Sequence, residues 1–98
     1  MEITKTQDGS TLTITLAGRL DTSTSPQLEE TIESSLDGIN ALAFDFTDLD
    51  YISSAGLRVL LSAQKKMNAA GTMVVKNVCE PIMEVFEMTG FADILTIE

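Results

Sequence analysis

Histidine and tryptophan are absent from this sequence, and cysteine occurs once, at Cys79. Without histidine, the triads that activate a serine or cysteine nucleophile cannot be built, and zinc sites that combine histidine with cysteine are excluded too. A single cysteine also excludes an intramolecular disulfide. Because the commonest catalytic groups are missing, we expect a protein that is not an enzyme and that binds no metal or other cofactor.

Positive charge is also scarce. Six Lys and Arg stand against 15 Asp and Glu, which gives a net charge of −9. The basic residues are spread along the chain, and only Lys65 and Lys66 are neighbours. Nucleic acids and anionic membranes are bound by clustered positive charge, so neither is expected as a ligand. The acidic balance favours solubility and a basic patch on a protein partner.

Long apolar runs are missing as well. No stretch approaches the roughly 20 apolar residues that cross a bilayer, and no apolar segment follows a basic N-terminus. We therefore expect no membrane insertion and a cytoplasmic location. A length of 98 residues matches one domain of ordinary size, here residues 1–98. We expect the free chain to be a monomer.

The residues that are present alternate between strand and helix patterns. Leu12, Ile14 and Leu16 alternate with threonines, as in a half-buried strand, and Asp8-Gly9 before them is a strong hairpin signal. Ser25 followed by Pro26 is typical of an N-cap and the first turn of a helix. Strands are predicted at 1–7, 11–17, 41–46 and 72–76, and helices at 25–37, 54–70 and 81–89, with 94–97 as a final short strand or an edge.

The predicted order is therefore β-β-α-β-α-β-α. Strands that alternate with helices form parallel neighbours joined by right-handed crossovers. The fold class is α/β, with a mixed sheet of four or five strands, an antiparallel first hairpin and crossover helices.

The most informative segment is 45–57, which follows the predicted central strand. In open α/β sheets, functional groups gather beyond the carboxyl ends of the strands. Here Ser53 and Ser54 place two hydroxyls at the start of a helix, where unpaired N–H groups accommodate an anion. Each serine is either an ordinary helix cap or a functional group. Gly56 is expected to leave the backbone open to another surface.

The run Tyr51–Leu61, YISSAGLRVLL, resembles the signature of STAS domains, the family of the bacterial anti-sigma-factor antagonists. Gly18–Asp21, GRLD, resembles the Gly-x-Leu-Asp element of the same family, and the resemblance extends over the whole chain. It implies a STAS-like fold and a partner-switching regulator of transcription. Such a protein binds an anti-sigma factor that is also a serine kinase, is released on phosphorylation, and is restored by a serine phosphatase.

Aligned on Gly56-Leu57, the resemblance places the phosphorylated hydroxyl on Ser54. The preceding residue is commonly aspartate in the family and is serine here, so Ser53 is a rival site. The implied partner-binding surface comprises Asp21, Ser53, Ser54, Ala55, Gly56, Leu57 and Arg58. Arg58 is predicted to meet a phosphate or a partner carboxylate, or else to be a solubilising surface arginine. Asp21 either borders the serine segment or stabilises its own turn.

Two other functions are compatible with the sequence. Asp48 and Asp50 after an apolar strand are similar to the paired carboxylates of aspartate-dependent phosphohydrolases, although that chemistry requires further groups on later strands. The same STAS fold also serves as an accessory subunit of lipid or anion transporters, with a different partner on the same helix face.

Overall fold

The computed structural model describes residues 1–98 and contains one four-stranded sheet. The strands are β1 (Glu2–Asp8), β2 (Thr11–Leu20), β3 (Ala41–Ile52) and β4 (Thr72–Lys76). The helices are α1 (Ser25–Ser35), α2 (Ser54–Ala70) and α3 (Glu80–Thr89), followed by the 3₁₀ turn η1 (Phe91–Asp93). The element order and the α/β class predicted from the sequence are confirmed.

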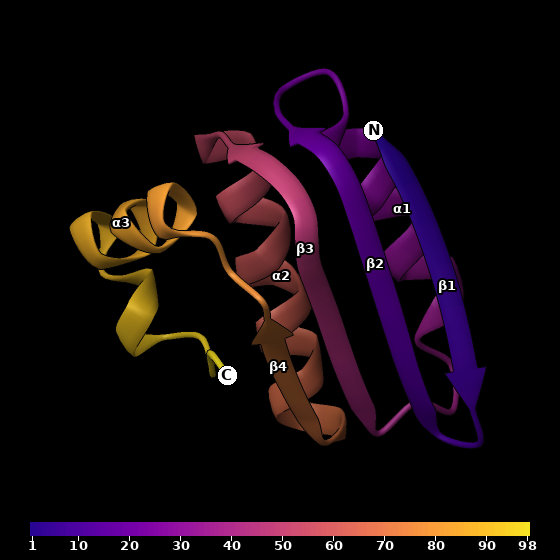
Figure 1. The fold of residues 1–98 in the computed structure, drawn as a ribbon. Coiled ribbons are helices and arrows are strands. Elements are labelled where there is room, and N and C mark those ends of the chain that lie inside the picture. The colour runs from indigo at the N-terminus through magenta and orange to yellow at the C-terminus, as the bar shows by residue number, and fades with distance from the viewer.

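The sheet runs β1-β2-β3-β4, with β1 antiparallel to β2 and the other pairs parallel. Gly9, with φ of +62°, closes the first hairpin in the left-handed conformation that such a turn requires. Because the parallel strands follow one another in one direction across the sheet, right-handed crossovers place α1 and α2 on the same face. Figure 1 shows both helices behind the sheet and α3 beside β3 and β4.

The core lies between the sheet and these two helices. Leu12, Ile14 and Leu16 of β2 are buried, as their alternation with threonine predicts. They face the apolar stripes of α1 (Leu28, Ile32) and α2 (Leu57, Leu60, Met67). Burying aliphatic side chains of this size stabilises the fold by about 1.5–3 kcal/mol each, so the two helices are held firmly against the strands.

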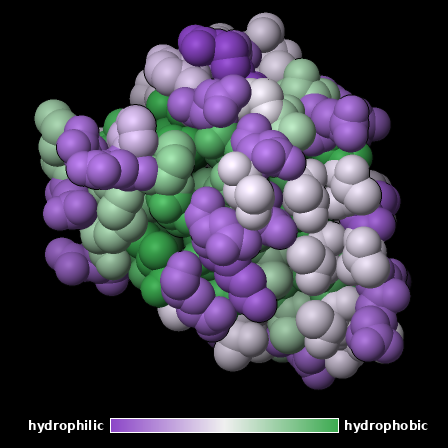
Figure 2. All heavy atoms as spheres, in the orientation of Figure 1, coloured by the Kyte–Doolittle hydropathy of each residue, from purple (hydrophilic) through white to green (hydrophobic).

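The opposite face of the sheet is largely uncovered. Thr13 and Thr15 of β2 are partly exposed there, and they pair with Thr6 and Thr4 of β1. In Figure 2 the region over β1 and β2 is mostly white and purple, whereas apolar atoms gather between α3 and the sheet. An antiparallel hairpin of this kind tolerates water on one side because its outward positions are polar. No helix in the structure is long and apolar enough to cross a bilayer.

The sequence placed the end of β3 too early. The strand continues past Phe46 to Ile52, and two register shifts against β2 insert extra residues into it. Bulges break the period-two pattern, so the buried residues after Phe46 are Leu49 and Ile52, three positions apart. Asp45 supports the first irregularity, because its Oδ1 accepts hydrogen bonds from the Thr47 amide and hydroxyl, at 3.0 and 2.6 Å.

Smaller differences occur at element ends. Helix α1 begins at Ser25 with Thr24 as its N-cap and ends at Ser35, and α3 begins at Glu80, one residue before Pro81. The final segment forms an isolated parallel bridge between Val75 and Ile97, with no fifth strand. The sheet therefore has four strands, the lower of the two numbers that the sequence allowed.

Candidate functional site

The candidate site lies where β2 and β3 end side by side. Leu20 and Ile52 pair at the last register position, and the Ser53 amide donates a 2.9 Å hydrogen bond to the Leu20 carbonyl. The β2–α1 loop and the start of α2 are therefore fixed to one another. This end of the sheet brings Asp21 next to the two serines, which are more than 30 positions away in the chain.

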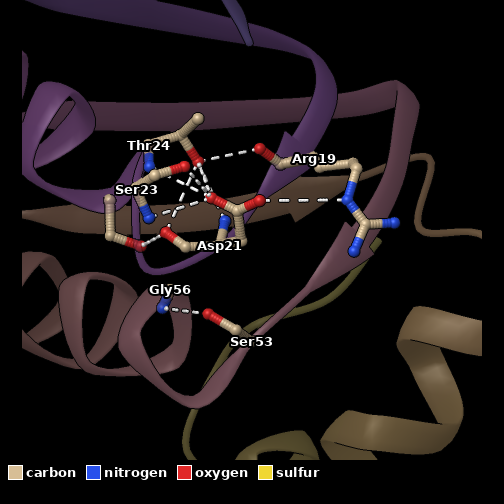
Figure 3. Close-up of polar contacts among 7 residues, drawn as sticks. Arg19, Asp21, Ser23, Thr24, Ser53 and Gly56 are labelled. Carbon is tan, nitrogen blue, oxygen red and sulfur yellow. Dashed lines mark hydrogen bonds and ion pairs between the residues drawn. The ribbon is translucent and has the colours of Figure 1, made fainter.

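The two serines have different positions and different tasks. Ser53 has the extended backbone of an N-cap (φ −99°, ψ 174°), and its Oγ accepts a 3.4 Å hydrogen bond from the Gly56 amide. Ser54 is the first helical residue, and its side chain is exposed. One cap needs only one hydroxyl, so the hydroxyl of Ser54 is left over (Figure 3 shows the Ser53 cap).

Gly56 and Leu57 do not lie on a surface. Both are buried, and a Cβ on Gly56 would lie 2.7 Å from Leu20 Cγ and 2.9 Å from Ile52 Cγ1. The expectation that Gly56 leaves the backbone open to another protein is wrong. Glycine stands here because the first turn of α2 approaches the ends of β2 and β3 too closely for a side chain. Both residues therefore position Ser54 from inside the fold.

Asp21 organises the loop between β2 and α1. Its Oδ1 accepts hydrogen bonds from the Ser23 amide (3.0 Å), the Ser23 hydroxyl (2.8 Å) and the Thr24 amide (3.1 Å). Figure 3 shows these contacts converging on the carboxylate. The Ser25 hydroxyl donates to the Asp21 carbonyl at 2.6 Å. Asp21 thus borders the serine segment through the chain fold, and its hydrogen bonds stabilise its own turn.

These hydrogen bonds lower the pKa of Asp21. The Ser23 hydroxyl is the largest cause, partial desolvation opposes it, and the Thr24 and Ser23 amides lower the pKa further. A depressed carboxyl pKa contributes stability that is present above the unfolded value of about 3.9 and is lost as the pH falls through the folded value. Asp21→Asn should therefore lower the free energy of unfolding at pH 7, and the difference from wild type should disappear in acid.

Urea denaturation at pH 7 and pH 3 measures this difference. Asp45 is the matched reference, because hydrogen bonds from Thr47 and Asn77 lower its pKa too, in a different part of the sheet. Because Asp45 is intact in the Asp21→Asn variant, the free energy of unfolding of that variant should still fall between pH 7 and pH 3. A difference between wild type and Asp21→Asn that is the same at both pH values would contradict the assignment.

Sequence patterns did not reveal a pair formed by Arg19 and Tyr51. The Arg19 guanidinium lies over the Tyr51 ring, 4.1 Å from its centroid, and Arg19 Nε is 3.8 Å from Asp21 Oδ2. Arg19 and Tyr51 are opposite each other only because the second register shift of β3 precedes them. The available signal was residue type alone, since arginine and tyrosine are the side chains that protein interfaces favour.

Arg58 and Ala55 lie on the helical side of the site. They line a shallow groove of about 220 Å³ between the first turns of α1 and α2, together with Pro26 and Glu29. Arg58 is exposed and takes part in none of the three ion pairs of the molecule. It is therefore free to meet an external group, as one of its predicted roles requires.

The acidic pair Asp48 and Asp50 lies inside β3, and both side chains are exposed. The phosphohydrolase alternative rested on their position beyond the end of the strand, and that position is wrong because β3 continues to Ile52. In a bulged strand segment the two carboxylates are not presented by a loop at the carboxyl edge, where such sites form.

Comparison with known proteins agrees with this architecture. The family model of the STAS domain matches residues 2–98. The anti-sigma-B factor antagonist of Listeria monocytogenes is 31% identical to the chain, over 96% of this chain and 84% of the relative. BtrV of Bordetella bronchiseptica is 33% identical, over 99% of this chain and 85% of the relative.

The fold is also that of solved structures. SpoIIAA in its unphosphorylated form superposes with a TM-score of 0.79 at 20% identity, covering 99% of this chain and 87% of that one. The phosphorylated form of SpoIIAA, a Bacillus cell fate determinant, gives 0.78 at 20% identity, with 99% and 91% covered. With the family model matched along nearly the whole chain and the strand and helix order in place, this chain belongs to the STAS domain family.

Proposed function

We propose that this protein is an anti-sigma-factor antagonist that works by partner switching in the cytoplasm. It binds an anti-sigma factor that is also a serine kinase, and phosphorylation of Ser54 releases it. A serine phosphatase reverses the modification. The names of the 31% identical Listeria protein and of BtrV both contain the words anti-sigma factor antagonist or anti-sigma-B factor antagonist, which supports the antagonist role. The two solved forms of SpoIIAA, unphosphorylated and phosphorylated, support control by phosphorylation.

The observation that carries the proposal is the exposed hydroxyl of Ser54. Its neighbours on the same turn are engaged: Ser53 caps the helix, and Gly56 and Leu57 are buried. A kinase reaching this end of the sheet therefore meets Ser54 as the accessible hydroxyl of the pair. Because the residues beneath it belong to the core, the hydroxyl is presented in a fixed position.

Phosphorylation at this position suits a reversible switch. A phosphoryl group adds roughly −1.5 to −2 charges, and the positive end of the α2 dipole tolerates that charge at the first helical residue. The folded domain should therefore survive the modification. A bound partner would have to enclose the same charge without its water, which is costly. The change acts on the interface and leaves the fold intact.

The direct test is incubation with ATP and each purified anti-sigma factor kinase of the source organism, followed by mass spectrometry. We expect one phosphoryl group, located on Ser54 by peptide fragmentation. Ser53→Ala should still be phosphorylated, although loss of the cap lowers the free energy of unfolding by about 0.5–1 kcal/mol. Ser54→Ala should not be modified. Phosphate on Ser53, or on a residue outside this pair, would refute the assignment.

A further inference from the structure

Both arginines of the chain, Arg19 and Arg58, lie at the end of the sheet that carries Ser54. Arg19 is at the end of β2, and Arg58 is four residues after Ser54 on α2. In a chain with a net charge of −9, this places planar cationic groups on both sides of the candidate site. Each arginine has a carboxylate beside it, since Asp21 lies 3.8 Å from Arg19 and Glu29 lines the same groove as Arg58. This end of the sheet therefore offers two separate guanidinium groups and not a positive patch.

Arg19 is held in place although its side chain is 61% exposed. Its face lies on the Tyr51 ring at 4.1 Å, and its Nε edge points to Asp21 at 3.8 Å. Figure 3 shows Nε joined to Asp21, one terminal nitrogen pointing away from Asp21 and the other lying below Nε, and only Nε is part of the ion pair. These terminal N–H groups form the fork that binds a carboxylate with two parallel hydrogen bonds. An exposed arginine usually loses side-chain entropy on binding, and this loss is smaller here because Arg19 is already oriented.

The supports of Arg19 are themselves fixed. The other oxygen of Asp21 is occupied by Ser23 and Thr24, so its carboxylate cannot turn away to follow a ligand. Tyr51 is 40% exposed, one of three large apolar side chains that reach the surface, and stands three residues before Ser54. Tyrosine and arginine dominate the residues that contribute most to protein–protein binding. The Arg19–Tyr51 pair therefore combines apolar area with an oriented cation.

We propose that the Arg19–Tyr51 pair is a main binding element of the partner surface and that the partner presents an aspartate or glutamate to the terminal nitrogens of Arg19. The proposal rests on the proposed function, because it names the chemistry of the protein that Ser54 regulates. It also gives an electrostatic reason, in addition to steric bulk, why a phosphoryl group on Ser54 weakens partner binding. An anion on Ser54 repels the partner carboxylate that Arg19 holds nearby.

The overall charge of the chain makes the opposite expectation reasonable, namely that the partner is basic here and that Arg19 only neutralises Asp21. The two cases predict opposite changes in affinity when the charge of Arg19 is reversed. If the partner contributes a carboxylate, reversing the charge of Arg19 weakens binding. If the partner contributes a lysine or arginine, the same reversal strengthens binding, because one more negative charge then faces it.

The experiment is calorimetric titration of wild type, Arg19→Gln, Arg19→Glu and Tyr51→Ala with each purified anti-sigma factor of the source organism. For the factor that binds wild type, we expect Kd to rise about tenfold or more for Arg19→Gln and Tyr51→Ala. It should rise further for Arg19→Glu. Lys65→Glu is the matched control, since Lys65 is an exposed cation well along α2, and its Kd should stay near wild type.

Thermal unfolding of each variant shows whether the domain remains folded, as expected for side chains this exposed. A charge exchange completes the test: replacing the contacting acid of the partner by lysine should restore binding to Arg19→Glu. Unchanged or tighter binding by the Arg19 variants would overturn the proposal while leaving the proposed function standing. If no anti-sigma factor binds wild type, the proposed function itself fails.

Discussion

Ser54→Asp is expected to weaken binding of the anti-sigma factor about a thousandfold while the domain stays folded. Ser54 is exposed at the first position of α2, so a carboxylate there gains from the helix dipole, by roughly 0.3–1 kcal/mol. Within an interface the same carboxylate loses its water and meets the acid that we place opposite Arg19. A penalty of about 4 kcal/mol corresponds to a thousandfold change in Kd.

Calorimetric titration gives the change in Kd, and thermal unfolding checks the fold. Ser54→Asn is the matched control, because asparagine has the shape of aspartate without its charge. It should bind much better than Ser54→Asp, and Ser54→Ala should bind close to wild type. Equal losses for the aspartate and asparagine variants would mean that bulk, and not charge, drives release. Wild-type affinity in the aspartate variant would contradict the electrostatic mechanism.

The fold was largely predictable because its signals are local. Alternation marks β2, the glycines after α2 and α3 mark where these helices end, and the apolar stripe of α2 is continuous from Leu57 to Met67. The end of β3 was missed because its register depends on β2. Two extra residues disturb the alternation after Asp45, and no local pattern shows that the partner strand continues to pair beyond them.

The site was predictable in position and only partly in detail. The Ser-Ser pair at a helix start can be recognised in the sequence. Which serine caps the helix and which leaves its hydroxyl exposed depends on which one has the extended backbone. The role of Gly56 depends on Leu20, a residue 36 positions earlier in the chain. The sequence therefore placed Gly56 at the surface, whereas it is buried against the core. The Arg19–Tyr51 pair depends on a register shift and was not predicted.

The contact between Leu20 and Gly56 leads to the largest expected effect on stability. Leu20 is buried, and its carbonyl accepts the hydrogen bond from Ser53 that joins β2 to the start of α2. Leu20→Ala should lower the free energy of unfolding by about 2–5 kcal/mol, because it removes buried methyl groups and leaves a cavity beneath the first turn of α2. Urea denaturation at pH 7 measures the change.

Gly56→Ala should also lower the free energy of unfolding, because it adds a methyl group where there is no room and does not leave a cavity. Its new methyl group would lie 2.7 Å from Leu20 Cγ, so the helix or the leucine must move. Overpacking of this kind costs about 1–3 kcal/mol, and the higher helix propensity of alanine returns roughly 1 kcal/mol. Gly9→Ala does not serve as a control, because Gly9 has a positive φ. The helix-propensity part alone is given by comparing Ser62→Ala with Ser62→Gly, since Ser62 is an exposed residue in the middle of α2.

The double variant, which combines Leu20→Ala with Gly56→Ala, tests whether residues 20 and 56 are in direct contact. Leu20→Ala clears the volume that the methyl group of Gly56→Ala needs, so the two losses should not add. We expect the double variant to be at least about 1 kcal/mol more stable than the sum of the single losses predicts, a coupling typical of residues in contact. Losses that add within about 0.5 kcal/mol would mean that the first turn of α2 has moved away from Leu20. In that case Ser54 would not be held by the core, and its exposure would not distinguish it from any surface serine.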